Sequence, residues 1–133
     1  DELTERIVNN LVQNNIVIVH TSDLITNFDG FSEELLQAEL TKASLAGKIT
    51  DYLAELTKRV LERRQAILIT LGGETSYKCC HAINATQLQL IDEVMPAIAL
   101  SLDHNAQWIV TKSGNLGGIN TLIDILKYFE HHE

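Results

Sequence analysis

Apolar residues along the chain alternate between a helical spacing and short continuous runs. The helical spacing covers four stretches, which are Asp1–Asn14, Ser32–Arg64, Glu74–Ile83 and a terminal stripe over Leu122–Phe129. A repeat of three to four residues places apolar side chains on one face, so each stretch predicts an amphipathic helix. Because an unbroken helix over the second stretch would be about 48 Å long, we expect a break between Ala43 and Gly47.

The continuous runs are rich in β-branched residues and leucine, and they predict strands. They are Ile16–Val19, Ala66–Leu71, Gln87–Ile91, Ile98–Leu102 and Trp108–Thr111. Short apolar runs of this kind are typical of strands that are buried on both faces. Pro96 lies between the third and the fourth run and predicts an extended or turning segment there. We expect the fourth run at the edge of the sheet.

Helices and strands alternate in this order, which predicts the α/β class. We expect a three-layer domain with a mostly parallel sheet, mixed at its edge and flanked by helices. Ligands of such sheets bind at the carboxyl ends of the strands. Polar or glycine-rich turns follow three of the predicted strands, at His20–Ser22, Gly72–Thr75 and Lys112–Asn115. We therefore expect the functional site at this edge of the sheet.

The first glycine turn, Gly72 to Ser76, reads GGETS and joins a predicted strand to a predicted helix. Such a turn leaves backbone N–H groups unpaired at the positive end of the helix dipole, where a phosphate binds well. Thr75 and Ser76 add hydroxyl groups. Glu74 could hold Mg²⁺ through water or bind a ribose, or it is a solvated acid of the first helical turn. A glycine pair after a strand can also serve only the tight packing of a helix.

The second glycine turn, Lys112 to Gly118, reads KSGNLGG and follows the last predicted strand. A lysine at the end of a buried strand can meet a phosphate as a point charge, or it can extend its ammonium group into solvent. Neither turn has the spacing of a P-loop or of the dinucleotide fingerprint. Two turns of this form in one short chain suggest one site that is assembled from both.

Composition limits the function classes. The chain has 133 residues, of which 45% are hydrophobic and 21% charged, as in a folded single domain. Its 10 basic and 18 acidic residues give a net charge of -8 with neutral histidines, which argues against a nucleic-acid or anionic-membrane partner. No membrane-spanning run or signal peptide is visible, which predicts a cytoplasmic protein.

The cysteines and histidines do not suggest a metal site. Cys79 and Cys80 are adjacent, and neighbours in a helix point about 100° apart, so they make a poor disulfide or metal pair. The five histidines lack the paired spacing of metal ligands, so we expect no metal cage of His and Cys side chains and assign no metal-ligating residue.

The two turns resemble those of a known family. The segments ITLGGETS, DEVMPAIAL, VTKSGNLGG and LIDILKYF are similar to the C-terminal nucleotide-binding domain of the four-carbon acid sugar kinases. In that family a strand is followed by Thr-Gly-Gly-(Asp or Glu)-Thr and later by Lys-Ser-Gly-(Asn or Gly)-Phe-Gly. The spacing from Gly72 to Gly114 agrees. Leu71 and Leu116 replace the usual Thr and Phe, and the stretch from Met95 to Ile98 replaces Pro-Gly-Val-Pro.

The resemblance implies a kinase that transfers the γ-phosphoryl group of ATP, with Mg²⁺, to a four-carbon acid sugar such as 3-oxo-tetronate or threonate. Backbone amides of both turns would hold the phosphates, and lysine would offset their charge. The implied nucleotide-binding residues are Gly72, Gly73, Glu74, Thr75 and Gly114, with Lys112, Ser113 and Asn115 lining the same pocket. The hydroxyl group of Ser76 is added to this set. No catalytic residue is assigned.

The resemblance also implies that part of the enzyme lies outside this chain. Family members carry an N-terminal domain that binds the acid sugar, and Asp1 already lies inside a helical pattern. We interpret residues 1–133 as one nucleotide-binding domain from the C-terminal part of a two-domain kinase. A kinase needs its acceptor in line with the γ-phosphate, so we expect the isolated piece to bind nucleotide weakly without turnover.

Two alternatives remain beside the kinase. One is a non-catalytic or regulatory module that binds a nucleotide or another anion, and the other is a structural domain whose glycines serve packing. A homo-oligomer is compatible with each of them.

Overall fold

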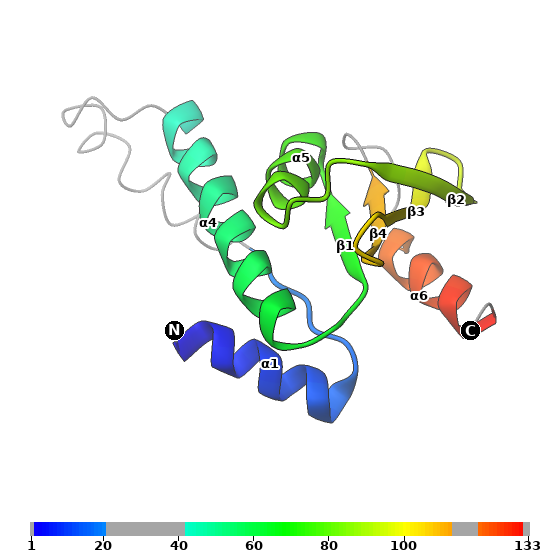
Figure 1. The fold of residues 1–133 in the computed structure, drawn as a ribbon, viewed down its shortest axis with the longest axis horizontal. Coiled ribbons are helices and arrows are strands. Elements are labelled where there is room, and N and C mark those ends of the chain that lie inside the picture. The colour runs from blue at the N-terminus through cyan, green and yellow to red at the C-terminus, as the bar shows by residue number, and fades with distance from the viewer. Residues whose placement is uncertain (1, 21–41, 113–119, 132–133) are drawn as a thin grey trace. The chain divides into compact units, whose positions relative to one another are not determined.

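The computed structural model describes residues 2–20, 42–112 and 120–131 (Figure 1). Its elements are α1 (Glu2–Asn14), α4 (Lys42–Arg63), β1 (Leu68–Leu71), α5 (Gly73–Ala82), β2 (Leu88–Met95), β3 (Ile98–Asp103), β4 (Trp108–Lys112) and α6 (Thr121–His131). The chain divides into two compact units, residues 1–64 and residues 65–133. That all of it forms one nucleotide-binding domain stays a prediction.

Among its described residues, the first unit contains the helices α1 and α4, which pack through their apolar faces. Ile7 of α1 and Leu56 and Val60 of α4 are buried together, and partly buried side chains surround them. Burial of an aliphatic side chain of this size contributes about 1.5–3 kcal/mol. The ion pair between Arg63 and Glu5, at 3.1 Å, is exposed on both sides and adds little. The apolar faces therefore hold this unit together.

The expected break near Gly47 is wrong. Helix α4 runs without interruption for 22 residues from Lys42, and Gly47 lies inside it. Thr50 donates a hydrogen bond to the carbonyl of Gly47 at 2.9 Å. A glycine in a helix interior costs only about 1 kcal/mol, and the apolar face on its carboxyl side continues the helix. The predicted helical residues 32–41 and the predicted loop 23–31 lie outside the described residues.

The expected strand at Ile16–Val19 is also wrong. Residues 16–20 have no regular secondary structure, and Ile16, Ile18 and Val19 are 50%, 60% and 45% exposed. A β-branched run prefers a pleated, half-buried surface and forms a strand only when another strand pairs with it. His20 was predicted to follow the end of this strand, and it does not, because the strand is absent. Residues 21 and 22 of the same predicted turn lie outside the described residues.

The second unit contains a sheet with the strand order β1-β4-β3-β2 among the described residues. Strands β1 and β4 are parallel, whereas β3 is antiparallel to both β4 and β2. A turn of two residues, Pro96 and Ala97, joins β2 to β3, which forces that pair to be antiparallel. Strand β3 therefore lies inside the sheet. The expectation that it lies at the edge is wrong.

Helices flank this sheet, and the predicted α/β class is confirmed (Figure 1). Ile125 of α6 is buried with Val110 and Leu100, and Ile69 of β1 packs against this cluster. Thr70, the next residue of β1, contacts α5 instead. Successive residues of a strand point to opposite faces, so α6 and α5 cover opposite faces of the sheet.

Candidate functional site

The carboxyl ends of β1 and β4 lie side by side. The parallel register pairs Leu71 with Lys112. The N–H group of Gly72 then donates to the carbonyl oxygen of Lys112 at 2.8 Å. This hydrogen bond thus joins Gly72, the first residue of the first glycine turn, to Lys112, the first residue of the second. Ser113, Gly114 and Asn115, which were expected at this site, lie outside the described residues.

Gly72 has a backbone conformation that requires glycine. Its φ is 106° and its ψ is 140°, and it precedes the first residue of α5. A Cβ atom at Gly72 would find only the Thr75 hydroxyl, at 3.9 Å, so the backbone conformation and not crowding excludes a side chain. A Cβ atom at Gly73 would meet no atom of residues 2–20, 42–112 or 120–131 within 4 Å. No described side chain therefore crowds Gly73.

The first turn of α5 presents backbone N–H groups that the helix itself does not use. The N–H group of Ser76 donates to the carbonyl of Gly72 at 3.0 Å, and this is the first bond of the helix. Gly73, Glu74 and Thr75 precede it, so no carbonyl lies one turn back for their N–H groups. No side chain caps this helix at Gly72. Three such groups at the positive end of a helix dipole form an anion-binding arrangement.

The charged residues at this edge are Glu74 and Lys112. Glu74 is exposed in the first turn of α5, where a carboxylate interacts favourably with the helix dipole. Lys112 is half-buried at the end of β4, the strand that pairs with β1 at this edge. The edge therefore has backbone donors, a lysine residue and a carboxylate.

The hydroxyl group of Ser76 is engaged by the protein itself. It donates to the carbonyl of Gly72 at 2.7 Å and lies 2.7 Å from the hydroxyl group of Thr70. Thr70, in β1, is only 4% exposed. Sequence reasoning did not single out Thr70, because only the packing of α5 on β1 brings the two hydroxyl groups together.

The two cysteines of α5 form no disulfide bond within the described part of the chain. Cys79 is buried and Cys80 is half-buried. Burial raises the pKa of Cys80 above the 9.0 of an ordinary thiol, with smaller contributions from Cys79 and Asp103. The neutral thiol of Cys80 therefore dominates at neutral pH, which argues against a nucleophilic role for this residue.

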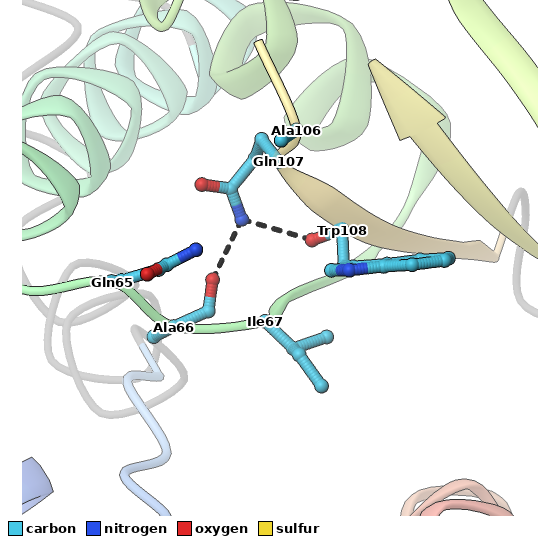
Figure 2. A pocket seen from close by; sticks show the side chains of 6 residues that line it. All are labelled: Gln65, Ala66, Ile67, Ala106, Gln107 and Trp108. Atoms are coloured by element: carbon cyan, nitrogen blue, oxygen red, sulfur yellow. Dashed lines mark hydrogen bonds between the residues drawn. The ribbon is translucent and has the colours of Figure 1, made fainter. Parts of the chain in front are cut away.

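A pocket of about 280 Å³ lies where β1 and β4 begin (Figure 2). The side-chain amide of Gln107 spans its floor and donates to the carbonyls of Ala66 at 2.7 Å and Trp108 at 2.9 Å. This is the end of the strands opposite Gly72 and Lys112, so the pocket is not part of the predicted site. The sequence did not reveal it, since only the parallel pairing of β1 with β4 builds it.

Within residues 2–20, 42–112 and 120–131, no three His, Cys, Asp or Glu side chains come together as ligands for a metal ion. No helix in the same ranges has the length and apolar character needed to cross a bilayer.

One family matches the chain. The model of a family described as a nucleotide-binding C-terminal domain matches residues 1–122, which include both glycine turns. No curated protein sequence matches significantly.

Related crystal structures share the fold. A protein of Haemophilus influenzae from the family DUF1537 aligns over 98% of this chain with a TM-score of 0.67 and 17% sequence identity. A domain of unknown function (DUF1537) from Bordetella bronchiseptica, with bound citrate and as a domain-swapped dimer, aligns over 59% with a TM-score of 0.55 and 26% identity. The chain covers only 31% and 21% of these two proteins.

Proposed function

The chain belongs to the family of nucleotide-binding C-terminal domains, and from this we propose that it is the ATP-binding part of a kinase acting on a four-carbon acid sugar. The family match bears out the resemblance that the two glycine turns indicate. The observation that carries the proposal is the 2.8 Å hydrogen bond from Gly72 to the Lys112 carbonyl. It joins a helix N-terminus with unused N–H groups to a lysine at the same edge of the sheet.

The residues of the first turn fit the phosphates of a nucleotide. The N–H groups of Gly73, Glu74 and Thr75 would donate to phosphate oxygens, and the open space at Gly73 allows a close approach. Lys112 would offset part of the phosphate charge. Ser113, Gly114 and Asn115 belong to the proposal through the family resemblance.

Magnesium would accompany the nucleotide. Mg²⁺ binds through one or two carboxylates together with phosphate oxygens and water, and the exposed carboxylate of Glu74 fits this role. The ion supplies charge neutralisation at the phosphates when it is bound. The protein groups that hold the phosphates in place are the backbone amides and Lys112.

The acid sugar and the catalytic base are proposed to come from a part of the protein outside this chain. Phosphoryl transfer depends on holding the acceptor hydroxyl in line with the γ-phosphate, and the proposal assigns only phosphate contacts to the described residues. The domain-swapped dimer of the Bordetella relative supports a homo-oligomer.

A titration calorimetry experiment on the full-length protein tests the nucleotide site. We expect saturable binding of Mg-ATP and Mg-ADP. The variant Gly73→Val should weaken it about tenfold or more, a loss equal to one or two charge-assisted hydrogen bonds. The added Cβ atom would meet no described protein atom within 4 Å, and it lies on a residue whose N–H group is proposed to contact the phosphate. Gly47→Val is a matched control, because a Cβ atom at Gly47 also meets no atom within 4 Å.

The outcomes separate the functions. If the folded wild-type protein does not bind either nucleotide at millimolar concentration, the proposal is wrong. If it binds and Gly73→Val binds equally well, the nucleotide lies elsewhere. Nucleotide binding without phosphorylation of any four-carbon acid sugar would favour a non-catalytic module over a kinase.

A further inference from the structure

Two hydroxyl side chains lie beneath the first glycine turn, one on each side of it. Thr70 belongs to β1 and Ser76 to the first turn of α5, and their oxygen atoms are 2.7 Å apart. Thr70 is 4% exposed and Ser76 is half-buried. A contact this short between two neutral hydroxyl groups is a good hydrogen bond, and burial shields it from competing water.

The direction of the protons follows from the partners. The Ser76 hydroxyl lies 2.7 Å from the carbonyl oxygen of Gly72, which can only accept, so Ser76 donates there. A hydroxyl group has one proton, so the bond between the two hydroxyl groups is donated by Thr70. The alternative acceptor for Thr70, the carbonyl of Val110, is farther away at 3.5 Å. The hydrogen bonds thus run from Thr70 to Ser76 to the Gly72 carbonyl.

This relay fixes the peptide group between Gly72 and Gly73. The carbonyl of Gly72 accepts from both the N–H group of Ser76 and its hydroxyl group. In a planar trans peptide the C=O and the following N–H point in opposite directions. A Gly72 carbonyl held toward the helix therefore aims the Gly73 N–H group away from it, toward the open side of the turn.

A second hydrogen bond holds Gly72 through its N–H group. The N–H group of Gly72 donates to the Lys112 carbonyl at 2.8 Å. Gly72 has a φ of 106°, outside the region that a helix or strand imposes, so no regular element sets its orientation. Its orientation depends on these hydrogen bonds, and the direction of the helix N-terminus relative to Lys112 depends on them too.

We infer that Thr70 and Ser76 are positioning residues of the phosphate site, which aim the N–H groups of the first turn of α5 at the phosphates of a nucleoside diphosphate or triphosphate. The inference rests on the proposed nucleotide site. It adds Thr70 to that site, and it changes the role of Ser76 from a ligand contact to a support of the turn.

The test compares ligand affinity with stability in the full-length protein. The variants Thr70→Val and Ser76→Ala remove one hydroxyl group each, and Ser76→Thr keeps it. Ser101→Ala is the matched control, because Ser101 is also buried, at 7% exposure, but lies in β3 away from the turn. The dissociation constant of ADP is measured by calorimetry well below the unfolding temperature, and stability is measured by urea unfolding.

We expect Thr70→Val and Ser76→Ala to raise the dissociation constant of ADP about five- to tenfold, the effect of one hydrogen bond. Ser76→Thr should restore binding to within about twofold. The double variant should bind about as weakly as either single variant, because one break interrupts the relay. Ser101→Ala should leave ADP binding unchanged, whatever it does to stability.

Each result decides something. No ADP binding by the wild type overturns the proposed nucleotide site, and the inference with it. Wild-type binding that Thr70→Val and Ser76→Ala leave unchanged overturns the inference alone, and lower stability in these variants would then show a purely structural role. If Ser76→Ala does not fold, Thr70→Val, which keeps the shape of the side chain, decides the question by itself.

Discussion

Single residues at the turn matter through their backbone more than through their side chains. Gly72 binds β4 through its N–H group and Ser76 through its carbonyl, and it takes a φ of 106° that other residues rarely adopt. Gly73 offers open space and an N–H group. The phosphate site proposed here is therefore built mainly from main-chain atoms.

At the same scale, Cys80 should make stability depend on pH in the alkaline range. Burial raises the pKa of the native thiol above 9.0, followed in size by the effects of Cys79 and Asp103. Because the pKa of Cys80 is higher in the native than in the unfolded protein, folding favours the neutral thiol. The contribution of Cys80 to the free energy of unfolding is therefore complete below pH 9.0 and is lost as pH rises through the pKa of the native thiol. Iodoacetamide at pH 8 should label Cys80 more slowly in the native than in the urea-unfolded protein.

The variant Cys80→Ser is the control for this effect. Tyr128, whose pKa is raised by its hydrogen bond to Asp92, acts in the same direction at high pH, and the variant leaves it in place. The loss of stability above pH 9 should be smaller in Cys80→Ser than in the wild type. Native labelling as fast as unfolded labelling would show that the thiol is not protected by burial.

At the scale of elements, the β2–β3 hairpin decides how the sheet is ordered. Its two-residue turn has Pro96 first and Ala97 second, and Ala97 has a φ of 68°. Proline suits the first position of such a turn, whereas the second position with positive φ favours glycine. The hairpin returns β3 directly beside β2, and β3 then pairs with β4 on its other edge. One strained residue thus stands in the turn that places β3 inside the sheet.

The variant Ala97→Gly should stabilise the protein by about 0.5–1 kcal/mol, because glycine adopts a positive φ without strain. The strain energy that is relieved exceeds the entropy cost of ordering a glycine on folding. Urea unfolding measures the change. Ala99→Gly, two residues on in β3, is the matched control and should destabilise by a similar amount, since it lies in regular strand structure. A destabilising effect of Ala97→Gly would mean that the strain at Ala97 is negligible.

At the scale of the whole molecule, the site depends on bringing distant parts of the chain together within an acidic protein. Gly72 and Lys112 are neighbours only because β1 and β4 pair in parallel. The chain carries a net charge of -8 with neutral histidines, so the proposed phosphate site would have to attract an anion against the overall charge. In the proposal, local donors and the Lys112 ammonium group supply that attraction.

Nucleotide should therefore stabilise the folded protein in a way that depends on Lys112. Binding at a hundred times the dissociation constant adds about 2.7 kcal/mol to the free energy of unfolding, which raises the thermal midpoint as Mg-ADP is added. At fixed nucleotide, Lys112→Ala should show a smaller rise. Lys58→Ala, an exposed lysine of α4, is the control and should keep the full rise. An equal rise in both variants would exclude Lys112 from the site.

The sequence by itself determined the features that depend on near neighbours along the chain. Periodicity predicted α1, α5 and α6 and the strands β1 and β4 to within a few residues. The glycine turn between β1 and α5 was predicted correctly, because a positive φ and a helix N-terminus are local properties. Lys112 was singled out by its place at the end of a strand.

Only the tertiary structure decided the features that need a partner from elsewhere in the chain. The run Ile16–Val19 has a high strand propensity but forms no strand. Gly47 has a low helix propensity but lies inside the uninterrupted helix α4. In both cases pairing and packing override the local preference. The place of β3 inside the sheet followed from pairing on both of its edges. The role of the Ser76 hydroxyl group depended on Thr70, which α5 meets only when it packs on β1. A hydrogen bond forms between groups that folding brings to within about 3 Å of each other. The sequence pattern does not predict which distant groups come that close.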